Sequence, residues 1–184
     1  LDPPIKHLFV WNSDIANCTP DSSNVRDGLK RKDLFTVVHD TFWTDSCMYA
    51  DVILPADTQL EHTDLHAPYG HYYFSLTQQA IKPLGESKSN QDLFRELAKQ
   101  MGYKEKCFKE SDESMIKNMI DPKHNPLFKG VTYQKLKKNG WVKGDVNNPR
   151  RNYLKTGWPT KDKKIQIYSE DTKKIGLGAY PSYT

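Results

Sequence analysis

The chain has 184 residues, of which 36% are apolar and 27% are charged, and its formal net charge is +4. No apolar run approaches the roughly 20 residues that a membrane-spanning helix needs, and no basic-then-apolar leader opens the chain. Because it begins at Leu1 without a methionine, we expect a processed product or an excised segment. The composition predicts a folded domain with long polar loops or a poorly packed tail.

The first 55 residues predict a strand–helix–strand unit followed by a third strand. The expected strands are 7–11, 34–39 and 51–54, and the expected helices are 20–32 and 45–50. Thr44 is a suitable N-cap for the second helix, and Pro55 ends the third strand because it has no amide to donate. A strand–helix–strand unit of this length is a right-handed crossover and implies a parallel sheet.

The elements expected further along the chain are less regular. They are a polar loop over 56–70, an extended segment over 71–76, helices over 90–101, 111–120 and 132–139, a turn-rich linker over 144–151 and a short strand over 165–168. The helix over 90–101 is the clearest, because its apolar residues form one stripe. Ser89 and Asp92 also have the spacing of a capping box, and Gly102 stands at the expected C-terminal position.

These patterns predict an α/β fold: a mostly parallel sheet with helices on both faces, in a Rossmann-like three-layer arrangement. We expect this region to cover residues 1–104 and an irregular, helical, basic extension to cover 105–184. In such folds ligands bind at the carboxyl ends of the parallel strands. Residues 1–104 are therefore expected to bind a ligand at this edge of the sheet.

Charge is unevenly distributed along the chain. Residues 1–100 contain 9 Lys/Arg and 14 Asp/Glu, a net charge of −5, whereas residues 101–184 contain 18 and 9, a net charge of +9. A basic region can bind nucleic acid or an acidic partner. The lysines do not gather on one helix face or alternate with aromatic residues, so we interpret them as a solvated surface and expect no nucleic-acid partner.

No local motif predicts a metal centre or a common catalytic site. The cysteines Cys18, Cys47 and Cys107 are far apart, so they build no local iron–sulfur or thiolate zinc site. A metal-dependent hydrolase remains one alternative, because His62, Asp64 and His66 alternate and would share one face of a strand. A free-standing nucleotide-binding α/β module is a second alternative. The sequence contains no G-x-G-x-x-G or Walker loop.

Three segments carry a resemblance to a known family. They are LFVWNSDIANCTPD at 8–21, the stretch over 35–61 that includes HD at 39–40 and YADVILPA at 49–56, and residues 69–103. In order and spacing they resemble the molybdopterin oxidoreductases, also called the DMSO reductase family. The resemblance covers about 5–104, and 158–160 and 164–170 are similar to the link into the family's C-terminal barrel. Asp14 stands where the family usually has Asn, and Ile15 where it has Pro.

The resemblance implies that the chain is an internal fragment of a catalytic subunit. The parent enzyme would use molybdenum bis(molybdopterin guanine dinucleotide) for two-electron redox chemistry or oxygen-atom transfer. It would also hold an iron–sulfur cluster, though not in this segment. Its partners would be the rest of the same polypeptide and an iron–sulfur electron-transfer subunit, in a bacterial or archaeal periplasm or cytoplasm. The isolated fragment is expected to be inactive and to insert into no membrane.

The resemblance also implies that residues 1–104 bind the nucleotide part of the cofactor, and which residues contact it. The pyrophosphate needs backbone amides at a strand-to-helix turn, and one carboxylate can accept both the ring NH and the amino group of guanine. Asp40, at the end of a strand, suits the second role. Thr44 and Asn90 could instead cap helices. The expected cofactor-binding residues are Asn12, Ser13, Asp14, His39, Asp40, Thr44, His71 and Asn90, with no catalytic residue and no metal ligand.

Overall fold

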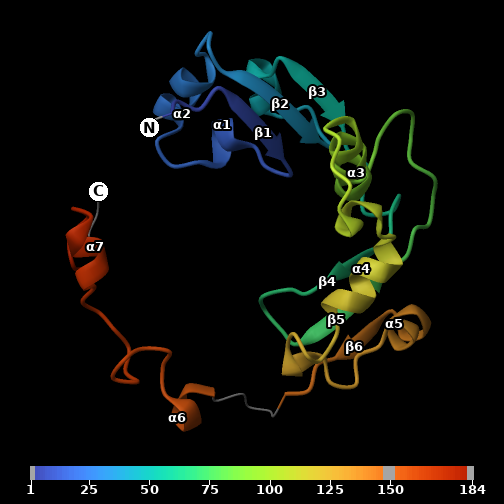
Figure 1. The fold of residues 1–184 in the computed structure, drawn as a ribbon, viewed down its shortest axis with the longest axis vertical. Helices are drawn as coiled ribbons and strands as arrows, with labels where there is room; N and C mark the ends of the chain where they lie inside the picture. The colour runs from blue at the N-terminus through green and yellow to red at the C-terminus, as the bar shows by residue number, and fades with distance from the viewer. Residues whose placement is uncertain (1–2, 147–151, 182–184) are drawn as a thin grey trace. The chain divides into compact units, whose positions relative to one another are not determined.

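The computed structural model describes residues 3–146 and 152–181, and the chain divides into two compact units, 1–145 and 146–184 (Figure 1). The boundary expected at residue 104 falls inside the first unit and stays a prediction. No helix within the described ranges is long and apolar enough to cross a membrane.

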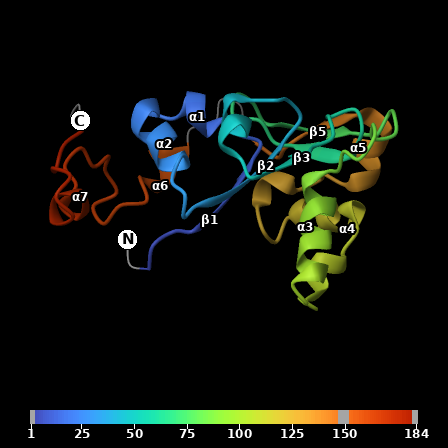
Figure 2. The same cartoon turned by 90° about the horizontal axis from the view of Figure 1, so that it is seen from above.

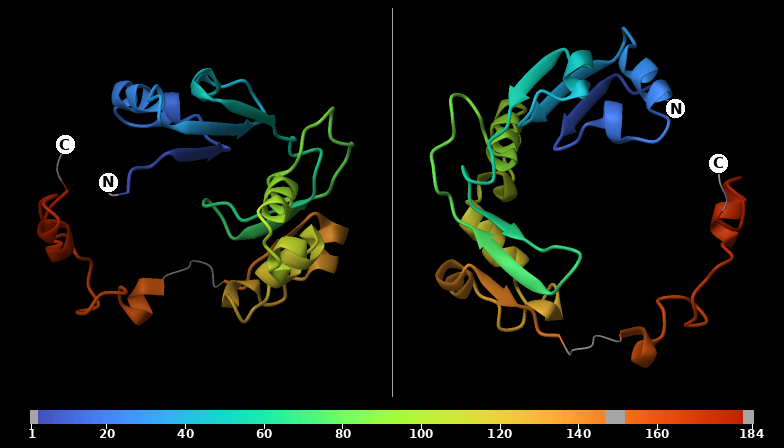
Figure 3. Two further views of the ribbon diagram at one scale, coloured as in Figure 1. Left: turned by 45° about the horizontal axis from the view of Figure 1, so that its top comes forward. Right: turned by 180° about the vertical axis from the view of Figure 1, so that it is seen from behind.

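The amino-terminal part of the first unit is a parallel sheet. Its strands, in the order β1-β2-β3, are β1 (His7–Trp11), β2 (Phe35–Asp40) and β3 (Val52–Pro55). Figure 3 shows them running side by side in one direction. In this register Trp11 lies opposite His39, and Asp40 lies opposite Pro55. The predicted α/β class with a parallel sheet is confirmed.

Helices cover both faces of this sheet. The elements concerned are α1 (Ile15–Cys18), α2 (Ser22–Leu29), the 3₁₀ helix η1 (Asp45–Tyr49) and α3 (Asn90–Gln100). Successive side chains of a strand point to opposite faces. Val10 and Val38 are buried together with Cys47 of η1, whereas the ring of Trp11 lies 5.4 Å from that of Phe94 in α3. The predicted three layers follow from this alternation.

The helix α3 begins and ends as its sequence predicts. The Ser89 hydroxyl accepts a hydrogen bond from the Asp92 amide (3.1 Å), and Gly102 adopts a φ of +79°. The helix expected over 20–32 is shorter, because Asp21 takes a left-handed conformation (φ +54°) before α2 begins. Thr44 occupies the N-cap position of η1, but its side chain makes no capping bond.

A second sheet in the first unit is antiparallel. Its strands, in the order β4-β5-β6, are β4 (Asp64–His66), β5 (Tyr73–Thr77) and β6 (Trp141–Lys143). Only β5 was expected, as the extended segment over 71–76. The other two have three residues each, too few to show a periodic pattern, so the expectation of a loop throughout 56–70 was wrong at 64–66.

Within the described part of the chain, three helices pack on this second sheet: α4 (Asp112–Met119), η3 (Pro126–Phe128) and α5 (Tyr133–Asn139). The short 3₁₀ helix η2 (Lys106–Lys109) contacts α3 instead. Leu136 of α5 is fully buried among Phe74, Leu76, Ile116 and Val131. Arg95 joins α3 to α4 through an ion pair with Asp112 (2.6 Å), and Figure 2 shows the two helices beside each other.

The second unit contains two short helices, α6 (Asn152–Thr156) and α7 (Glu170–Lys174). The strand predicted over 165–168 was wrong, because the described residues offer it no neighbouring strand; 165–166 are irregular and 167–168 form bends. Most of the linker predicted over 144–151 lies outside the described residues.

Candidate functional site

The turns that follow β1 and β2 meet at the carboxyl edge of the parallel sheet. The Asn12 amide donates to the His39 carbonyl oxygen (3.3 Å), and the Ala56 amide donates to the Asp40 carbonyl oxygen (3.0 Å). These two hydrogen bonds connect the ends of all three strands at one edge of the sheet. This edge is where α/β proteins bind ligands. The structure therefore brings together Asn12, His39 and Asp40 of the predicted set.

The turn after β1 exposes backbone to solvent. Asn12 has a φ of +52°, a left-handed conformation that asparagine tolerates better than most residues. Ser13 is exposed and makes no hydrogen bond with any other described residue. The Ser13 amide is thus a donor available to a ligand at this edge.

Asp14 has protein partners. Its Oδ1 accepts hydrogen bonds from the Ser46 amide (3.0 Å) and the Ser46 hydroxyl (2.6 Å). The same hydroxyl oxygen accepts from the Ala16 amide (3.1 Å), and Ser46 is 1% exposed. Asp14 therefore fixes the turn after β1 to η1 across 32 positions of sequence.

Asp40 is held by its own turn. Its Oδ1 accepts from the Phe42 amide (3.1 Å) and from the Thr41 hydroxyl (3.4 Å). The other carboxylate oxygen, Oδ2, has no hydrogen-bond partner among the described residues, and the residue is half-buried. This arrangement orients a carboxylate with accepting capacity left over for a ligand.

His39 is fully buried, and one of its ring nitrogens lacks a partner. Nδ1 lies 3.2 Å from the Leu54 carbonyl oxygen, which can only accept, so Nδ1 is the donor; in a neutral imidazole Nε2 is then an acceptor. Nε2 is buried without a hydrogen bond in the described structure. Because buried polar atoms are nearly always paired, Nε2 marks a place where a donor is missing.

The other three predicted residues differ in their surroundings. Asn90 is the first residue of α3, Ser89 is the cap, and the Asn90 Oδ1 is buried without a partner in the described structure. The Thr44 hydroxyl lies 3.7 Å from the Cys47 sulfur. His71 is exposed before β5, where its Nδ1 accepts from the Tyr73 amide (3.2 Å), and no contact within the described ranges joins it to the carboxyl edge.

A cavity of about 380 Å³ lies beside Asn90, a volume that suits a small ligand. Its lining includes three side chains that are not among the predicted cofactor-binding residues: Trp11, Gln91 and Phe94. Trp11 is the last residue of the strand predicted over 7–11, and its side chain is 48% exposed. The feature of the sequence that could have identified Trp11 as a lining residue is its position: a large aromatic residue directly before the polar turn.

The loop after β3 contains the residues of the alternative metal site, and they do not converge. His62 Nδ1 contacts Asp57 Oδ1 (2.9 Å), and His66 Nε2 contacts the Thr77 hydroxyl (2.8 Å). Within the described ranges no group of three His, Cys, Asp or Glu side chains could hold a metal ion. Burial raises the pKa of Asp57 despite the nearby His62.

Glu61 in the same loop is expected to make stability depend on pH. Its Oε2 accepts from the Thr58 amide (2.6 Å) and its Oε1 from the Leu84 amide (2.7 Å). The bonds from Thr58, and then that from Leu84, lower the pKa of Glu61. A lowered pKa gives stability that is complete above the ordinary glutamate pKa, about 4.3, and is lost as the pH falls through the folded-state value.

The substitution Glu61→Gln therefore lowers the free energy of unfolding most at neutral pH, and the difference from wild type shrinks as the pH falls below about 4. Urea unfolding at pH 7, 5 and 3.5 measures this difference. Glu86→Gln, at an exposed position, is the control. A difference that stays constant across this range contradicts the assignment.

Comparison with known proteins identifies the family. Residues 2–100 match the sequence profile of the molybdopterin oxidoreductases. The chain belongs to the molybdopterin oxidoreductase family. It is 42% identical over 183 residues to probable oxidoreductase YoaE of Bacillus subtilis (strain 168), covering 100% of this chain and 26% of that protein. It is 33% identical over 146 residues to the F420-dependent formate dehydrogenase subunit alpha of Methanocaldococcus jannaschii, covering 78% of this chain and 21% of that subunit.

A solved structure of the family agrees with the fold. The acetylene hydratase from Pelobacter acetylenicus matches with a TM-score of 0.68 and 25% identity, over 98% of this chain and 24% of that enzyme. The chain thus spans about a quarter of the length of these family members. Membership implies a molybdenum–pterin cofactor. Each relative named here is a longer protein than this chain, and one of them is the alpha subunit of a formate dehydrogenase.

Proposed function

We propose that this segment holds the nucleotide part of one molybdopterin guanine dinucleotide in a molybdenum-dependent oxidoreductase. The observation that carries the proposal is the Asp40 carboxylate, which the Phe42 amide fixes at the carboxyl edge with Oδ2 left to accept. A guanine presents a ring NH and an amino group side by side. The free Oδ2 would accept from one of these groups, and Oδ1 would accept from the other in place of its long bond from the Thr41 hydroxyl (3.4 Å). The Phe42 amide keeps the carboxylate oriented, which limits the reorganisation needed on binding.

The turn after β1 supports the pyrophosphate half of the proposal. The Ser13 amide, which follows the left-handed Asn12 and has no partner among the described residues, is a backbone donor at the edge where the phosphates would pass. In this proposal Asp14 acts through Ser46, holding the turn and touching no phosphate. An acidic side chain beside a pyrophosphate would otherwise weaken binding.

Two unpaired acceptors support a ligand beside α3. His39 Nε2 and Asn90 Oδ1 are both buried without partners in the described structure, and Trp11 and Asn90 line the 380 Å³ cavity. Amino and hydroxyl groups of a nucleotide are donors of the kind these atoms lack. Thr44 and His71 stay in the proposal as outer contacts, His71 toward the pterin.

The bound cofactor would supply two-electron redox chemistry at its molybdenum. The residues of this segment would bind and orient the cofactor and would contribute neither a metal ligand nor a catalytic group. An iron–sulfur cluster elsewhere in the parent and an electron-transfer subunit complete the proposal. The isolated segment would then be inactive.

The test is Asp40→Asn in the protein expressed from its complete reading frame without cofactor. Titration calorimetry with GDP should show binding about tenfold weaker than wild type, because one charge-assisted contact is lost. The preference for GDP over ADP should also fall. Asp27→Asn, at an exposed residue that pairs with Lys30, is the matched control. Unchanged GDP affinity in Asp40→Asn would contradict the proposal.

A further inference from the structure

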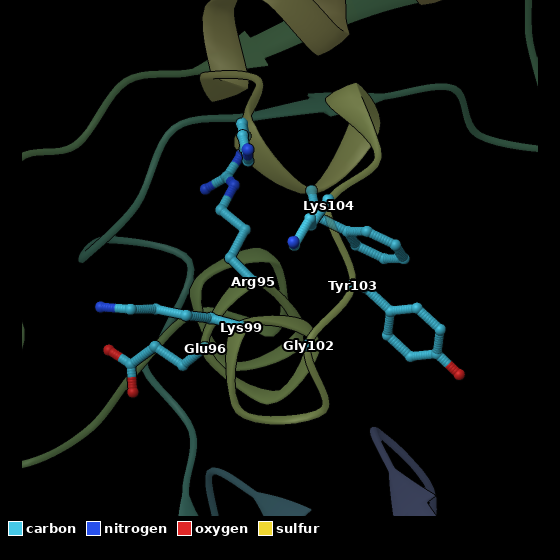
Figure 4. A pocket seen from close by; sticks show the side chains of 8 residues that line it. Arg95, Glu96, Lys99, Gly102, Tyr103 and Lys104 are labelled. Atoms are coloured by element: carbon cyan, nitrogen blue, oxygen red, sulfur yellow. The ribbon is translucent and has the colours of Figure 1, made fainter.

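A second pocket lies at the C-terminal end of α3, at the opposite end of the helix from Asn90. Its volume is about 440 Å³, and Figure 4 looks along the helix into it. Arg95, Glu96 and Lys99 leave the helix on one side, while Tyr103 and Lys104 stand on the turn after Gly102. Lys109 and Phe108 of η2 complete the lining.

The helix end does not need the lysines of this pocket. Lysines near a helix C-terminus often bond the last free carbonyl groups. Here the backbone already satisfies those groups: the carbonyls of Leu97, Ala98 and Lys99 accept from the amides of Met101, Tyr103 and Gly102. Capping therefore does not explain why three lysines line this pocket.

Ion pairs neutralise two of the charged lining residues. Arg95 pairs with Asp92 (2.9 Å) and Asp112 (2.6 Å), and Glu96 pairs with Lys88 (2.6 Å). The remaining lining charges belong to Lys99, Lys104 and Lys109. None of these three ammonium groups has an acidic or hydrogen-bonding partner within the described ranges. The pocket therefore carries an uncompensated positive charge.

Aromatic rings form one wall of the pocket. The rings of Tyr103 and Phe108 are 5.7 Å apart and tilted by 30° to each other, and both residues line the pocket. Tyr103 is 48% exposed, which leaves ring area for a ligand. Flat ring systems stack on such surfaces.

We propose that this pocket binds a small anion that carries a flat ring, of the nucleoside phosphate class. Lys99, Lys104 and Lys109 would contact the phosphate, and the base would lie against Tyr103 and Phe108. The volume of about 440 Å³ suits a small molecule better than an extended acidic peptide. No residue of this lining belongs to the carboxyl edge and its occupation does not depend on Asp40, although the pocket shares Arg95 and Phe108 with the cavity beside Asn90.

The experiment titrates ADP, adenosine, pyrophosphate and hexaglutamate into the protein expressed from its complete reading frame, with GDP present at saturation. ADP should bind more tightly than adenosine or pyrophosphate, because each of those lacks one of the two contacts. In Lys99→Ala/Lys104→Ala the ADP affinity should fall by roughly tenfold or more, and the affinity should decrease with added salt. Tyr103→Leu should weaken ADP binding and leave pyrophosphate binding unchanged.

Two control variants test whether ADP binds at this pocket. Lys106→Ala/Lys129→Ala removes two exposed lysines outside the pocket and should leave ADP affinity unchanged. Asp40→Asn should also leave it unchanged, so failure of the cofactor proposal and failure of this one are distinguishable. Absence of ADP binding, pyrophosphate affinity equal to that of ADP, binding of hexaglutamate in place of ADP, or loss of ADP binding in Asp40→Asn would each overturn the proposal.

Discussion

Replacing Leu136 with alanine is expected to lower the free energy of unfolding by about 2–5 kcal/mol. Leu136 has no exposed surface and packs within the cluster of Phe74, Leu76, Ile116 and Val131. Truncation removes the buried methyl groups and leaves a cavity that β5 and α4 can fill only by moving. Alanine's better helix propensity recovers only a few tenths of a kcal/mol in α5.

Urea unfolding followed by circular dichroism measures this loss. Leu84→Ala is the matched control, since Leu84 is 83% exposed and its truncation should change the free energy by less than about 0.5 kcal/mol. If Leu136→Ala costs no more than Leu84→Ala, then the antiparallel sheet and its helices do not form the packed core described above.

The second large effect is expected at Asp14. Asp14→Ala removes the acceptor of the Ser46 amide and hydroxyl and leaves a buried donor unpaired. Hydrogen bonds to a charged group are strong, and a buried donor without a partner is costly, so the free energy of unfolding should fall by about 2–3 kcal/mol. The turn containing Asn12 and Ser13 should also become mobile, because its connection to η1 is lost.

Asp14→Asn separates geometry from charge. The Asn side-chain oxygen can accept the same two hydrogen bonds, so this variant should keep most of the stability that alanine loses. Thermal unfolding of both variants, with hydrogen exchange of the Ser46 amide, tests this expectation. Equal destabilisation by Asn and Ala would show that the carboxylate charge, and not the two bonds, holds the turn.

Local patterns were sufficient to predict the elements of the parallel sheet. Apolar runs that end in Asn12 or Pro55 predicted strands near their observed bounds, and the apolar stripe of α3 with Ser89 as its cap predicted that helix. These signals are local because side-chain periodicity and capping depend on neighbours within a few residues. The same patterns could not predict β4 and β6, which exist only because they pair with β5.

The candidate sites likewise combine features that the sequence predicts with features that depend on the tertiary structure. The sequence by itself determined that Asn12, His39 and Asp40 stand at the ends of strands, because polar residues follow apolar runs there. Only the tertiary structure decided that Asp14 bonds Ser46, that His39 Nε2 and Asn90 Oδ1 lack partners, and that Trp11 lines a cavity with residues of α3 and η2. The periodicity of the sequence indicates which side chains are buried. The hydrogen-bond partners and neighbours of those side chains depend on how segments far apart in the chain pack together.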